Sequence, residues 1–167
     1  MKSKSKALFL TNSAIIAAAY AVLTLISASL GLGYGSVQLR ISEALTVLPI
    51  FTPAAIPGLT IGCIIANVFS FNPIDMLVGT LATFFAAILT RKTRNITIKG
   101  LPLLSLLWPV LFNAVFVGAE LAIFFPSAKN LLWAFIIAAA QVGAGQVVVC
   151  YGLGLPLFLA LKKKRIY

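Results

Sequence analysis

Three acidic side chains are the first candidates for chemistry in this chain, because each lies inside or beside a long apolar run. They are Glu43, Asp75 and Glu120. An ionisable group inside a bilayer costs several kcal/mol and is by default a candidate functional residue. A carboxylate accepts hydrogen bonds from neighbouring N–H donors in bidentate fashion and can neutralise a cation. The acids therefore suit a site for a neutral or cationic nitrogen compound.

Each acid also has a structural interpretation. Segment 72–75 (Asn-Pro-Ile-Asp) resembles a helix start, in which Asn caps, Pro takes the first helical position and Asp75 meets the helix dipole. Arg40 precedes Glu43 by three residues, so a local ion pair would explain both. Glu120 has no neighbouring base in sequence, which favours a functional role, although Arg40 could reach it through space.

The sequence lacks the residues that several common kinds of catalysis require. Histidine is absent, and Cys63 and Cys150 are embedded in apolar runs, which leaves no usual zinc site and no Cys–His nucleophile. No G-x-x-x-x-G-K-[ST] loop occurs, so the chain cannot hydrolyse ATP by that route. We therefore expect no catalytic residues, no metal site and no enzyme.

The composition predicts an all-α integral membrane protein. Hydrophobic residues make up 61% of the 167 residues and charged residues only 10%, and the mean hydropathy is +1.08. Soluble domains are roughly 45–50% apolar and about 25% charged. The net charge of +10 would suggest nucleic acid in a soluble protein. Here the basic residues form short clusters between apolar runs, which indicates membrane topology instead.

Apolar runs of about 20 residues are typical of membrane-crossing helices, and we predict one domain, 1–167, with six of them. The expected helices are 7–30, 40–51, 54–71, 74–90, 101–125 and 130–161. Segment 40–51 is short, at ~18 Å if α-helical, but six crossings place the basic N-terminus, the loop 91–100 and the C-terminus together in the cytoplasm. Only Arg40 and Lys129 then lie outside, as the positive-inside rule requires.

This topology places the polar residues by depth. All three acids fall in the outer half of the membrane with Asn67, whereas Asn113 and Gln141 lie near its middle. Asn113 and Glu120 are seven residues apart, with Phe116 between them, and are expected to share a helical face. The glycine-rich segment 31–39 would form an outer loop suited to a flexible lid, with Tyr34 and Gln38 as its binding groups.

Small residues recur at four-residue spacing. Ala14 and Ala18, and likewise Ala17 and Ala21, form such pairs in the first helix, and a glycine pair, 58 and 62, does so in the third. Such faces allow helices to approach closely. Internal packing is the simpler interpretation, and a partner surface is the other.

One stretch resembles a known family. The segment 38–46 (Gln-Leu-Arg-Ile-Ser-Glu-Ala-Leu-Thr) with Leu48-Pro49 is similar to the signature of the queuosine-precursor transporter family. The segments 58–63 and 66–67, Asp75 and 79–83 resemble the same family. These proteins are substrate-binding S components of energy-coupling factor (ECF) transporters in the bacterial plasma membrane.

The resemblance implies a substrate, partners and site residues. S components bind substrate near the outer surface, under the loop joining the first two helices. They need no cofactor of their own, because a membrane scaffold subunit and two ATP-consuming cytoplasmic ATPases complete the importer. Alanine motifs of the first helix contact the scaffold, which would make Ala14, Ala17, Ala18 and Ala21 an interface. The implied substrates are 7-deazaguanine bases, including the aminomethyl form.

The predicted site combines the acidic residues with the substrate class that the resemblance implies. Glu43 and Glu120 would share two roles, accepting ring N–H donors and neutralising the aminomethyl group, in an order the residues leave open. Side chains that could complete the site are Arg40, Asp75, Asn67, Asn113, Gln38 and Gln141, with Tyr34, Phe116 or Trp133 stacking on the ring. A stand-alone carrier driven by protons through the two glutamates is the alternative.

Overall fold

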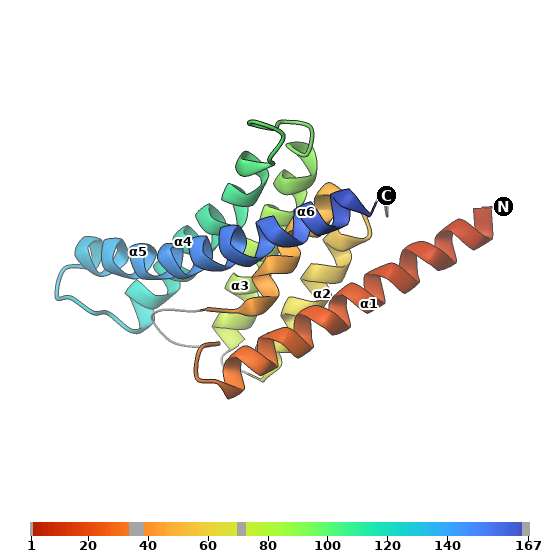
Figure 1. Cartoon of the computed structure of the whole chain (residues 1–167). Coiled ribbons are helices and arrows are strands. Elements are labelled where there is room, and N and C mark those ends of the chain that lie inside the picture. The colour runs from red at the N-terminus through yellow and green to blue at the C-terminus, as the bar shows by residue number, and fades with distance from the viewer. Residues whose placement is uncertain (1, 34–38, 70–72, 165–167) are drawn as a thin grey trace.

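The computed structural model describes residues 2–33, 39–69 and 73–164, with side chains from Ser5 onward. Helices make up all the regular elements of this part of the chain, and one isolated bridge joins Ile98 to Leu101 in the turn between two of them (Figure 1). The elements are α1 (Lys2–Ser29), η1 (Ile41–Ile50), α2 (Ala55–Val68), α3 (Pro73–Lys92), α4 (Leu103–Phe124), α5 (Leu131–Val149), η2 (Cys150–Gly154) and α6 (Leu155–Lys163). The all-helical prediction is confirmed.

Four helices in the described part of the chain are long and apolar enough to cross a membrane. They are Ser5–Ser29, Pro73–Lys92, Leu103–Phe124 and Leu131–Lys163, the last combining α5, η2 and α6. The other two predicted crossings form shorter apolar helices, η1 with 10 residues and α2 with 14. At ~2.0 Å per residue for η1 and ~1.5 Å for α2, each spans only about 20 Å of a ~30 Å hydrocarbon core. Six crossings and cytoplasmic termini therefore stay predictions.

The predicted second helix is a 3-10 helix buried inside the bundle. Packed against it are α1, α2, α3, α4, α5, η2 and α6. Pro49 lies within η1 and has no N–H to donate, and Arg91 Nη1 donates to the carbonyl oxygens of Pro49 and Ile50, both at 3.0 Å. The C-terminal carbonyls of η1 are thus satisfied by a side chain of α3.

Close contact between α1 and α2 depends on the predicted glycine pair. A Cβ atom on Gly62 would lie 2.7 Å from the carbonyl oxygen of Ala17, and one on Gly58 would lie 2.8 Å from that of Ser13. Ala17 and its partner Ala21 are buried at this contact. The small-residue spacing therefore serves internal packing on this face of α1.

A proline in α4 is compensated by its neighbour α3. Pro109 cannot donate to the carbonyl oxygen of Ser105, four residues earlier. Thr90 Oγ1 of α3 donates to that oxygen instead, at 2.9 Å. Every helix from α1 to α5 packs against the next one along the chain (Figure 1), so the polar residues of η1, α2 and α3 meet in one place.

Candidate functional site

Two of the predicted polar residues, Asp75 and Asn67, meet around the Arg40 side chain. Its Nη2 atom lies 3.3 Å from Oδ2 of Asp75, and its Nη1 donates to Oδ1 of Asn67 at 3.1 Å. Its Nε donates to the carbonyl oxygen of Gly33, at 3.0 Å, in the connection between α1 and η1. Asn67 Nδ2 donates to the Asp75 carbonyl at 3.2 Å. Arg40 thus ties α1, η1, α2 and α3 together.

The sequence left open which acidic residue forms an ion pair with Arg40. Arg40 pairs with Asp75 at the start of α3, rather than with its sequence neighbour Glu43 or with Glu120. Both members are buried, with side-chain exposures of 4% and 9%. The buried pair therefore links Arg40 to the first turn of α3, a role that the helix-start interpretation of Asp75 did not include.

Glu43 lies beside this pair and is almost fully buried, at 1% exposure. The hydroxyl of Tyr20 donates to its Oε1 atom, whereas Oε2 has no hydrogen-bond partner among the described residues. Arg40 is close enough to act electrostatically on both Glu43 and Tyr20. We call Tyr20, Arg40, Glu43, Asn67 and Asp75 the polar cluster.

Two cysteines border the polar cluster. Cys63 Sγ lies 3.5 Å from both Asn67 Nδ2 and Thr83 Oγ1. Cys150, at the start of the π-helical turn η2, has its sulfur 3.8 Å from the Glu43 carbonyl oxygen and 3.6 Å from Gln146 Oε1. Both cysteines therefore pack against polar groups rather than only among apolar side chains.

Two polar residues of this region were missed by the sequence analysis. Tyr20 lies in an alanine-rich apolar run, where a tyrosine reads as packing or as an interfacial residue. Gln146 is buried, whereas the predicted Gln141 is only half-buried on the same helix. A signal for Gln146 existed, because Cys150 follows it by four residues and so lies on the same helical face.

The remaining predicted residues lie elsewhere. Asn113 and Glu120 are both buried on α4. Phe116, which lies between them in sequence, packs against Phe85 and Phe112. Trp133 is 60% exposed near the start of α5. Tyr34 and Gln38 lie outside the described residues.

The predicted interface alanines divide between two faces of α1. Ala14 and Ala18 are exposed, and Ala17 and Ala21 are buried against the bundle. Only the first pair is available to another protein in this conformation.

The charges of the polar cluster leave one carboxylate unbalanced. Arg40 is matched by Asp75, so Glu43 can accept a hydrogen bond or a positive charge from a bound molecule. In the described part of the chain, no group of three or more metal-binding side chains occurs. A multi-pass helical membrane protein with a buried acceptor at its centre is the class that this fold and site define: a solute-binding or solute-carrying protein.

Comparison with known proteins assigns the family. The chain belongs to the QueT transporter family, since the family described as QueT transporter matches residues 10–163. A relative from Lactococcus lactis subsp. cremoris, named queuosine precursor transporter QueT, is 40% identical over 80 residues. That alignment covers 48% of this chain and 47% of the relative, about half the length of each. No solved structure matches the chain. The family resemblance seen in the sequence is therefore confirmed, and the family's description is that of a transporter rather than an enzyme.

Proposed function

We propose that this chain is the substrate-binding S component of an ECF-type importer for queuosine precursors in the bacterial plasma membrane. The relative's name and the resemblance of the Arg40–Thr46 segment support this substrate class. The substrates are 7-deazaguanine bases such as the aminomethyl form. The chain carries no cofactor, and ATP is consumed by partner ATPases.

The observation that carries this proposal is the second carboxylate oxygen of Glu43. It is buried and has no hydrogen-bond partner among the described residues, although a buried acceptor left unsatisfied costs about 1–3 kcal/mol. A deazaguanine ring presents adjacent N–H donors that would satisfy it. Because Tyr20 already holds Oε1, the carboxylate is oriented before the ligand arrives.

The second glutamate takes the positive charge of the ligand. Arg40 and Asp75 neutralise each other, which leaves Glu43 and Glu120 as the remaining acids. We assign Glu43 to the ring donors and Glu120 to the aminomethyl group. Both side chains are buried, with exposures of 1% and 5%, so the elements that cover them must move apart to admit a ligand.

The partner surface is assigned to the outward face of α1. Ala14 and Ala18 are exposed there, one turn apart, and small side chains allow a helix of the scaffold subunit to approach closely. Ala17 and Ala21 are buried and pack in the contact between α1 and α2.

Calorimetric titration of the detergent-solubilised chain tests the two assignments. The ligands are the aminomethyl deazaguanine and a deazaguanine with an uncharged substituent. Glu43→Gln replaces one acceptor oxygen by a donor and should weaken both ligands ~10- to 100-fold, since bonds to charged groups contribute roughly 1.5–3 kcal/mol. The matched variant Glu120→Gln should weaken only the aminomethyl ligand. A folded Glu43→Gln variant with unchanged affinity for both ligands would overturn the site.

Reconstitution tests the coupling to partners. Uptake of the aminomethyl deazaguanine into proteoliposomes should require the scaffold subunit, both ATPases and ATP. Uptake by this chain alone under a proton gradient would refute the ECF assignment and support the stand-alone carrier.

A further inference from the structure

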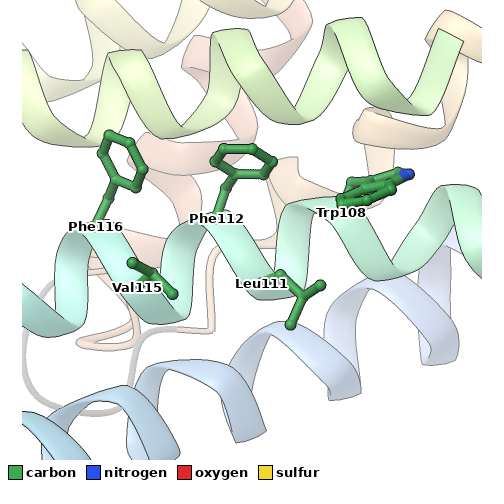
Figure 2. Close-up of a pocket in the computed structure, with 5 residues that line it drawn as sticks. All are labelled: Trp108, Leu111, Phe112, Val115 and Phe116. Atoms are coloured by element: carbon green, nitrogen blue, oxygen red, sulfur yellow. The ribbon is translucent and has the colours of Figure 1, made fainter. Parts of the chain in front are cut away.

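A shallow apolar groove runs along the outer surface of α4. It has a volume of about 190 Å³ and is lined by Trp108, Leu111, Phe112, Val115 and Phe116. Figure 2 shows Phe112 and Phe116 pointing toward α3 and Leu111 pointing toward α5, with Val115 in front of the α4 ribbon. Since all five residues lie on one helix, the groove is about 12 Å long at ~1.5 Å per residue.

Packed aromatic rings form one wall of this groove. The ring centroids of Trp108 and Phe112 are 6.3 Å apart, and those of Phe112 and Phe116 are 5.8 Å apart. Phe85 of α3 packs on both phenylalanines, with centroids at 6.0 and 6.3 Å. The rings support one another across two helices, so the wall belongs to the folded bundle.

The basic turn between α3 and α4 lies at one end of the groove. Trp108 Nε1 donates to Thr93 Oγ1 at 3.2 Å, which places this end beside Arg91, Lys92 and Arg94. Lys92 is exposed and follows Phe85 by seven residues, so it continues the same face of α3.

In the described part of the chain, no acidic side chain forms an ion pair with these basic residues. Arg91 donates to carbonyl oxygens of η1, and within residues 2–33, 39–69 and 73–164 the ion pair found joins Arg40 to Asp75. Asp75 lies 17 residues from Lys92 on the same helix, about 26 Å away. An anion from outside the chain would balance the charge of the turn.

We propose that the groove and the basic turn together bind one anionic phospholipid. An acyl chain lies along Trp108–Phe116, and the headgroup phosphate meets Lys92 and Arg94. The dimensions agree, because half of a ~30 Å hydrocarbon core is about 15 Å deep and the groove extends ~12 Å from its charged end. Trp108 lies where tryptophan is enriched, at the membrane–water interface. Basic clusters at this depth favour acidic lipids. This site is separate from the polar cluster and independent of the transported substrate.

Tryptophan fluorescence measures occupancy directly. The chain contains two tryptophans, Trp108 and Trp133, so the variant Trp133→Phe reports from the groove alone. It is reconstituted into equimolar mixtures of phosphatidylcholine with either brominated phosphatidylglycerol or brominated phosphatidylcholine, whose bromine atoms quench on contact. We expect the anionic lipid to associate with Trp108 about fivefold or more in preference to the neutral lipid.

Charge variants separate a defined site from general attraction to the surface. In the Trp133→Phe background, Lys92→Gln should reduce the preference about fivefold, in line with ~1 kcal/mol per basic residue at an anionic surface. Lys6→Gln removes the same charge from α1, a helix that packs on α2 and η1 rather than on α4, and should leave the preference intact. Equal quenching by the two brominated lipids, or equal effects of Lys92→Gln and Lys6→Gln, would overturn the proposal.

Discussion

Removing the charge of Arg40 should destabilise the protein strongly, because it breaks a buried ion pair. The Arg40–Asp75 atoms are 3.3 Å apart and buried, which corresponds to about 5 kcal/mol of attraction at an effective dielectric constant of 20. Removing one member of such a pair leaves the other charge buried and typically costs 3–5 kcal/mol. Arg40→Met keeps the apolar stem of the side chain but also loses the hydrogen bonds to Gly33 and Asn67. We therefore expect a loss of stability near the upper end of this range.

A double-mutant cycle distinguishes an ion pair from two independent contacts. Arg40→Met and Asp75→Asn should each lower the free energy of unfolding by about 3–5 kcal/mol. The double variant contains no buried charge from this pair and should lose much less than their sum. The assay is denaturant unfolding in detergent micelles, followed by circular dichroism. Losses that add fully, or that stay below about 1 kcal/mol each, would refute the assignment of Arg40 as the tie between these helices.

Three further predictions follow from packing, the partner surface and topology. Gly62→Ala places a Cβ atom 2.7 Å from a backbone oxygen of α1 and should cost about 1–3 kcal/mol in thermal unfolding, whereas Gly152→Ala, with no atom within 4 Å, should be neutral. Ala18→Leu should abolish co-purification with the scaffold subunit while leaving ligand binding intact. A cysteine at Ser127 should react with an impermeant thiol reagent on intact cells, and one at Asn95 only after permeabilisation.

Each of these predictions has an opposing result. Wild-type stability of Gly62→Ala would mean that α1 and α2 are not in close contact. Loss of ligand binding in Ala18→Leu would mean that this face of α1 serves internal packing rather than contact with a partner. Labelling of Asn95→Cys in sealed cells would contradict the cytoplasmic placement of the basic turn.

The long helices were predictable because membrane helices are encoded by long apolar runs. The predicted ranges 74–90 and 101–125 correspond to Pro73–Lys92 and Leu103–Phe124. The short segment 40–51 was predicted as a membrane-crossing helix, and it is helical in the structure, as the buried 3-10 helix η1. Its length and apolar character fit either helix type. The 3-10 form is accompanied by Pro49, which has no N–H to donate, and by Arg91, which lies 42 positions further along the chain and binds the Pro49 carbonyl oxygen.

The candidate site was only partly predictable from the sequence, because its contacts join residues of different helices. Glu43 and Asn67 stood out in the sequence as polar residues within apolar runs, and both are buried in the structure. The partner of Arg40 was left open between Glu43 and Glu120, yet Asp75 lies beside it because the start of α3 packs next to α2 and η1. Tyr20 carried no signal, since its hydroxyl matters only where α1 brings it to Glu43.

The sequence by itself therefore determined the membrane class, the helical content, the family and the set of polar residues worth testing. These properties depend on composition and local order, because the cost of placing each side chain in a bilayer is set largely residue by residue. The tertiary structure decided which polar groups pair, which face of α1 is buried, and that the groove on α4 ends at the basic turn. Each of these depends on the distance between atoms of different helices, and distances across a bundle follow from packing rather than from separation along the chain.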